Sequence, residues 1–85
     1  MSSPNWPLFR LTVATEADPG ALTRVLERFQ NVNVVPRKLL AELADSDTLH
    51  IQVDIAGLPA ETINLIVNKL GQVPCVLDAS WHWPS

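Results

Sequence analysis

The chain of 85 residues is poor in several residue types, and each shortage excludes a class of protein. Its single cysteine, Cys75, rules out an intrachain disulfide and a metal site built from several thiolates, so we expect a reducing, cytoplasmic setting. No run reaches the roughly 18 apolar residues of a membrane span. The first residues also lack the basic and apolar regions of a signal peptide, so we expect neither secretion nor membrane insertion.

Positive charge is also scarce. Six Lys and Arg residues stand against nine Asp and Glu residues, which gives a formal net charge of −3 at pH 7. Proteins that bind the phosphate backbone need a surplus of basic side chains to displace counterions. The sequence therefore predicts no nucleic-acid partner.

Apolar residues, by contrast, make up 47% of the chain. We expect one domain over residues 8–83, preceded by a flexible tail rich in Ser and Pro over residues 1–7. A domain this small buries only about 60% of its surface, so much apolar surface stays exposed. A homodimer is the expected result.

Four segments have the composition of β-strands. Leu8–Thr15 and Thr48–Ile55 alternate apolar and polar residues, which is typical of strands buried on one face. Val32–Leu43 is rich in β-branched residues, with an irregularity expected at Pro36 because proline lacks an N–H group. Val73–Trp83 also alternates, and its odd-numbered residues from Val73 to Trp81, Leu77 among them, are expected to face the core.

Two helices are predicted between these strands. Asp18 is a good N-cap, Pro19 suits the first helical position, and Asn31 tolerates the left-handed conformation that ends a helix. The second helix follows Gly57–Pro59 and ends at Gly71. The resulting order, βαββαβ, predicts an α+β, ferredoxin-like fold with a four-stranded antiparallel sheet and both helices on one face.

The predicted fold hosts many activities, and the loop before the first helix excludes some of them. Glu16–Gly20 contains neither the paired cysteines of a metal chaperone nor the arginine of an acylphosphatase-like hydrolase. The open face of the sheet lacks the stacking aromatics of an RNA-recognition module. The positions concerned hold Arg10, Thr12, His50, Gln52 and Asp54.

No group of residues has the spacing of a catalytic or metal site. His50 and His82 are expected at the surface or in an interface, and Cys75 is expected to fill the core as a small apolar residue. Trp81 and Trp83 are expected to cover a sheet edge or a dimer contact. We therefore predict no enzymatic activity and no cofactor.

The segment Asp18–Leu22 allows two interpretations. In the first it only starts a helix, with Asp18 as the cap. In the second, Gly20 lets a small ligand approach the amides of Gly20 and Ala21, where the helix dipole attracts a carboxylate. Asp18 would then meet the ammonium group of an amino acid.

The segment Asp18–Leu22, followed by Arg24–Leu26 and the polar face of His50–Asp54, resembles the ACT domain, an amino-acid-sensing module. Within that family the chain is similar to the single-domain small regulatory subunits of acetohydroxyacid (acetolactate) synthase. Where the family has Gly-aromatic-Asn-Ile, this chain has Asn31-Val-Asn-Val34.

The resemblance implies a site shared by two subunits, with an effector between the loop after the first strand and the segment after the first helix of the partner. The residues implied are Asp18, Pro19, Gly20, Ala21, Leu22, Asn31 and Asn33. It also implies a catalytic large subunit as partner and valine or isoleucine as effector. The alternative is a free-standing amino-acid-sensing dimer, or a protein-interaction module, without a synthase partner.

Overall fold

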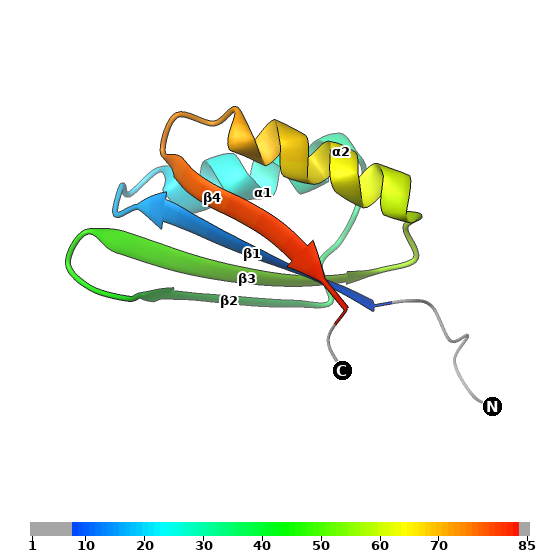
Figure 1. Ribbon diagram of the computed structural model, residues 1–85, viewed down its shortest axis with the longest axis horizontal. Coiled ribbons are helices and arrows are strands. Elements are labelled where there is room, and N and C mark those ends of the chain that lie inside the picture. The colour runs from blue at the N-terminus through cyan, green and yellow to red at the C-terminus, as the bar shows by residue number, and fades with distance from the viewer. Residues whose placement is uncertain (1–7, 84–85) are drawn as a thin grey trace.

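A computed structural model describes residues 8–83 as one antiparallel sheet covered by two helices on the same face (Figure 1). The predicted tail, residues 1–7, lies outside the described residues. The sheet order is β2-β3-β1-β4, so the ferredoxin-like βαββαβ prediction is confirmed. The elements are β1 (Leu8–Glu16), α1 (Ala21–Asn31), β2 (Lys38–Leu43), β3 (Thr48–Ala56), α2 (Ala60–Gly71) and β4 (Val76–His82).

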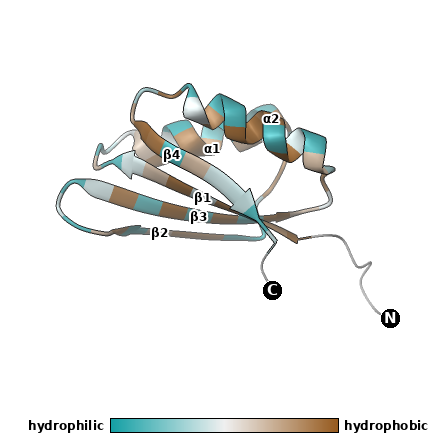
Figure 2. Cartoon of the chain, viewed as in Figure 1, coloured by the Kyte–Doolittle hydropathy of each residue, from teal (hydrophilic) through white to brown (hydrophobic). Residues whose placement is uncertain are grey.

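The two central strands supply the inner layer of the core. β1 and β3 pair over their whole length, from Leu8 opposite Ala56 to Glu16 opposite Thr48. Odd-numbered residues of both strands are packed in the core with the apolar residues of α1 and α2, as the alternating sequences predict. Figure 2 shows hydrophobic and hydrophilic residues alternating along β3. The fully buried side chains of this core include Phe9, Leu11, Val13, Val25, Phe29, Ile51, Val53, Ile55, Ile63, Ile66 and Leu70.

The start of α1 differs from the sequence prediction. The helix begins at Ala21 with Gly20 as N-cap, two residues after the predicted cap. The reason is a turn over Pro19 and Gly20, which is closed by a hydrogen bond from the Ala21 amide to the Asp18 carbonyl at 2.9 Å. Within this turn the Asp18 carboxylate accepts from the Gly20 amide at 2.8 Å, so it caps the turn rather than the helix.

The segment between α1 and β2 is a loop, although Val32–Leu43 was predicted as strand. Its left-handed residue is Asn33, with φ of 58°, and not Asn31. The amides of Val32 and Val34 both donate to the Phe29 carbonyl and hold the chain in a turn. Pairing with β3 starts only after Pro36, because proline has no amide to donate.

β4 also starts later than predicted, at Val76 instead of Val73. A register shift opposite Ala14 and Thr15 leaves Leu77 outside the regular pairing, and its side chain is 59% exposed. The prediction that Leu77 faces inward is therefore wrong. Cys75, just before the strand, is buried as predicted.

The tryptophans of the last segment pack against the start of β1. Trp81 donates from Nε1 to Oδ1 of Asn64 at 2.8 Å and makes an edge contact with Phe9. The Trp83 ring lies 4.4 Å from the Phe9 ring, centroid to centroid. Within residues 8–83, no helix has the length and apolar composition needed to cross a membrane.

Candidate functional site

A cavity of about 420 Å³ lies between the start of α1 and the β2–β3 hairpin. We call it the loop cavity. One wall comes from the segment that follows β1, and the other comes from β2, the hairpin turn and β3. Its lining residues are Ala17, Asp18, Pro19, Leu22, Leu43, Ser46 and Leu49.

The walls of the loop cavity are mostly aliphatic, with one carboxylate at the rim. Leu22 and Leu49 are partly buried against the core, while Leu43 is 63% exposed. The Asp18 side chain is 41% exposed. A few polar groups on an apolar concave surface are typical of small-molecule sites, and this combination suits a small aliphatic molecule that carries a positive group.

The Asp18 carboxylate already has two partners. Oδ1 accepts from the Gly20 amide, and Oδ2 lies 3.3 Å from Nη1 of Arg24. Both side chains of this ion pair are about half exposed, so water screens it and a ligand can compete for it. The nearby Cys75 side chain and the Asp18 charge raise the pKa of Arg24 above its ordinary value.

The amides of Gly20 and Ala21, which were predicted to bind a ligand carboxylate, are not free to do so. The Gly20 amide donates to the Asp18 side chain, and the Ala21 amide donates to the Asp18 carbonyl. The following amides, those of Leu22 and Thr23, donate to no carbonyl among the described residues. The anion-attracting part of α1 is thus shifted toward Leu22, which lines the loop cavity.

The predicted asparagines lie at the other end of α1. Asn33 lines a second cavity of about 350 Å³ together with Phe29, Val34 and Val35. Asn31 is exposed at the end of the helix and lines neither cavity. The 11 residues of α1 separate the two ends by about 16 Å, so one chain does not bring Asp18 and Asn33 together.

One wall of the loop cavity was not predicted from the sequence. Leu43, Ser46 and Leu49 come from the hairpin, about 25 positions further along the chain. The predicted topology contained the signal, because antiparallel pairing of β1 with β3 places Glu16 opposite Thr48. In a βαββαβ fold the hairpin turn therefore lies beside the end of β1.

Other reactive side chains in residues 8–83 form no second centre of this kind. No group of three His, Cys, Asp or Glu side chains in this part of the chain could hold a metal ion. His50 and His82 are exposed, on β3 and β4. Asp54 is 4% exposed and binds Arg10 on the sheet face that carries no helix.

Comparison with protein families decides the class of this fold. The family model described as an ACT-like domain matches residues 5–83. The chain belongs to the ACT-like domain family. The part of the resemblance that concerns the family is therefore confirmed. ACT domains are generally regulatory modules that bind amino acids, and they commonly dimerise. The relationship to acetohydroxyacid synthase subunits remains a prediction.

Solved structures agree on the fold. The chain is similar to the C-terminal domain of the MgtC protein from Mycobacterium tuberculosis, with a TM-score of 0.79 at 17% identity, covering 99% of this chain and 94% of that one. The ACT domain of GTP pyrophosphokinase from Chlorobium tepidum gives 0.78 at 13% identity, covering 92% and 100%. An uncharacterized protein from Thermotoga maritima gives 0.73 at 19%, covering 93% and 98%. No curated protein matches.

Proposed function

We propose that this ACT-like domain is a regulatory module that binds an amino acid with an aliphatic side chain in the loop cavity. The observation that carries the proposal is the pairing of an aliphatic wall with a half-exposed carboxylate, Asp18, at its rim. An α-amino acid has a matching arrangement, with an ammonium group next to its side chain. No catalytic activity is proposed for the chain itself.

The geometry favours one orientation of the ligand. The ammonium group replaces the Arg24 guanidinium on Oδ2 of Asp18, which costs little because that ion pair is exposed. The carboxylate turns toward the amides of Leu22 and Thr23 in the first turn of α1. The side chain of the ligand then rests between Leu22 and the hairpin.

A second copy would complete the cavity. All six residues of β2 are exposed, and among residues 8–83 β2 is an edge strand whose one neighbour is β3. Exposed edges of this kind pair readily with another chain. If two β2 strands pair antiparallel, the Leu43 end of one lies beside the Lys38 end of the other. The segment with Asn33 of the partner then approaches the loop cavity, and Val35, 86% exposed here, becomes covered.

The narrower proposal is that the module serves as the small regulatory subunit of an acetohydroxyacid synthase. It rests on the likeness of Asp18–Leu22 to the corresponding segment of those subunits. Valine or isoleucine would be the effector, and a catalytic large subunit the partner. Co-purification with such a large subunit tests this role, and a free-standing amino-acid sensor is the alternative if none binds.

Calorimetry with valine, leucine and isoleucine tests the ligand itself. We expect saturable heat for at least one of them and weaker binding by Leu43→Ser, which removes part of the aliphatic wall. Leu65→Ser is the matched control, because Leu65 is similarly exposed on α2 but lies outside the cavity. Absence of heat with all three amino acids, or equal losses in both variants, would contradict the proposal.

A further inference from the structure

The face of the sheet that carries no helix has an ordered charge pattern. We call it the open face. It consists of the even-numbered residues of β1, β2 and β3 and, on β4, of Asp78, Ser80 and His82. The strand register arranges its central part in three rows that cross all four strands. The face lies opposite α1 and α2 (Figure 1).

Each row has a distinct chemical character. In strand order, the basic row contains Lys38, Asp54, Arg10 and His82. The neutral row contains Leu40, Gln52, Thr12 and Ser80. The acidic row contains Glu42, His50, Ala14 and Asp78.

The three rows are self-complementary under a two-fold rotation. An axis along the neutral row keeps each strand over the same strand of a second copy and reverses its direction. The basic row of one copy then lies over the acidic row of the other. Lys38 meets Glu42 of the second copy and His82 meets Asp78, while Asp54, whose charge Arg10 balances, lies over His50.

We propose that the open face is an interface on which a second copy of this chain stacks, sheet against sheet, about this axis. The opposite orientation, with the axis parallel to the strands, would place the acidic rows over each other, and like charges would oppose it. The charge pattern therefore selects one arrangement. This interface is separate from the β2 edge and does not depend on amino-acid binding.

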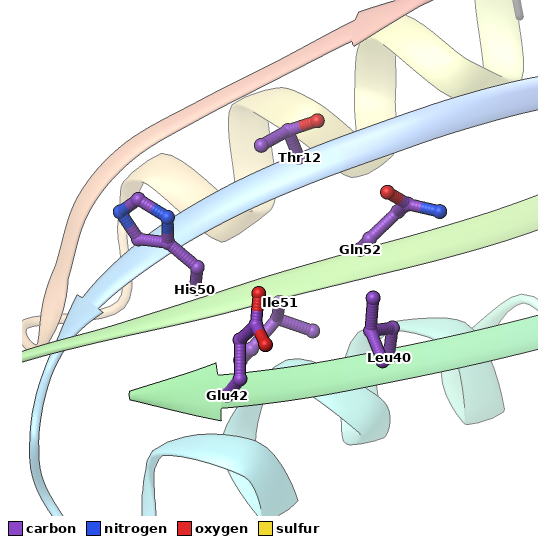
Figure 3. Close-up of a pocket in the computed structure, with 6 residues that line it drawn as sticks. All are labelled: Thr12, Leu40, Glu42, His50, Ile51 and Gln52. Carbon is purple, nitrogen blue, oxygen red and sulfur yellow. The ribbon is translucent and has the colours of Figure 1, made fainter. Parts of the chain in front are cut away.

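A hollow on the open face fits this arrangement. It has a volume of about 140 Å³, and its lining includes Thr12, Leu40, Glu42, His50 and Gln52 (Figure 3). It lies between the neutral and acidic rows on β2 and β3, where the stacked arrangement brings the lysine of the second copy. An ammonium group there meets the Glu42 carboxylate together with the polar atoms of Thr12 and Gln52.

The size of the open face is sufficient for a specific contact. Four strands spaced by about 4.8 Å, with a mean length near 26 Å, cover about 500 Å². Two stacked faces bury about 1,000 Å² in total, which is the lower limit for a specific interface. The uncharged neutral row occupies the centre, and the charged rows lie toward the rim, as in known interfaces.

Thr12→Lys tests the proposal, because Thr12 lies on the two-fold axis and faces its own symmetry mate. The substitution opposes two positive charges at the centre, and we expect the particle mass measured by sedimentation to be halved at tens of micromolar. Thr23→Lys makes the same change at an exposed position on α1 and should leave the mass unchanged. Circular dichroism checks that both variants fold.

This result does not depend on the proposed function. If the β2 edge also pairs, the parent is a tetramer and Thr12→Lys a dimer; if it does not, the parent is a dimer and the variant a monomer. A parent and a Thr12→Lys variant of equal mass would overturn the stacked arrangement in either case.

A charge exchange on β4 gives a second readout. His82→Glu alone opposes the Asp78 carboxylate of the second copy, and Asp78→Lys alone removes the carboxylate that His82 of the second copy faces. We expect each to raise the Kd of the stacked association about tenfold or more. The double variant recreates opposite charges between the two copies and should restore the association. A double variant as weak as the singles would overturn the proposed pairing.

Discussion

The guanidinium of Arg10 donates to both carboxylate oxygens of Asp54 across β1 and β3, at 2.8 Å from Nε to Oδ1 and 3.0 Å from Nη2 to Oδ2. These hydrogen bonds are the main cause that lowers the pKa of Asp54 below its ordinary value of 3.8. The ionised form of Asp54 is therefore favoured in the folded state.

This lowered pKa makes stability depend on pH in the acid range. The contribution of Asp54 to the free energy of unfolding is fully present above its ordinary pKa of 3.8. It is lost as the pH falls from that value through the lower pKa of the folded state, because the unfolded state binds the proton more readily. We expect Asp54→Asn to have a lower Tm at pH 7 and a smaller drop in Tm below pH 4, by calorimetry. Asp47→Asn, at an exposed position in the turn between β2 and β3, is the control. Equal acid dependence in parent and Asp54→Asn would refute this.

Asp18→Ala should weaken the turn before α1. The substitution leaves the Gly20 amide without its acceptor, and we expect a loss of about 0.5–1 kcal/mol in the free energy of unfolding by urea denaturation. Asp18→Asn retains an oxygen acceptor and should lose less. If the two variants unfold at the same urea concentration, the hydrogen bond to Gly20 does not stabilise the turn.

Asn33 has both a backbone role and a proposed binding role, and two substitutions separate them. Asn33→Ala keeps a β-carbon at φ of 58° but loses the local hydrogen bonding that makes this conformation accessible to asparagine, so we expect a loss of about 1 kcal/mol. Asn33→Gly accepts this conformation and should keep the parent stability. Amino-acid binding by Asn33→Gly, measured by calorimetry, then reports on the amide side chain alone. Equal stability of Asn33→Ala and the parent would contradict the expected strain.

Phe29 connects α1 to the sheet and is 1% exposed. Removal of its ring leaves a cavity in a small core, and we expect Phe29→Ala to cost about 3–5 kcal/mol. A domain of this size has little stability to lose, so the variant should be largely unfolded at 37 °C. A thermal melt within a few degrees of the parent would show that the core rearranges to fill the gap.

The sequence predicted those parts of the fold that local periodicity determines. Phe9, Leu11 and Val13 alternate as a strand requires, and Ile63, Ile66 and Leu70 recur at helical spacing, so both elements were found. Leu77 was misplaced because a register shift against β1 reverses the alternation, and pairing partners are not visible in a single strand.

The candidate site was predicted in part for the same reason. Asp18 and Leu22 lie in one contiguous segment of the sequence, and both line the loop cavity. The opposite wall, with Leu43 and Leu49, is brought there by the hairpin and carries no motif of its own. The amides of Gly20 and Ala21 donate to the carboxylate and to the carbonyl of Asp18, in a local turn that the N-cap pattern of the sequence did not predict.

The two edges of the sheet differ in how they can grow. β2 presents an exposed, regular edge, whereas β4 is distorted at Leu77 where its register with β1 shifts. A sheet with two regular edges can add copies without limit and form a polymer, while a bulge twists an edge away from further pairing. If β2 pairs with a second copy as proposed, edge-to-edge growth therefore ends at two copies, because the distorted β4 edges are the ones left open.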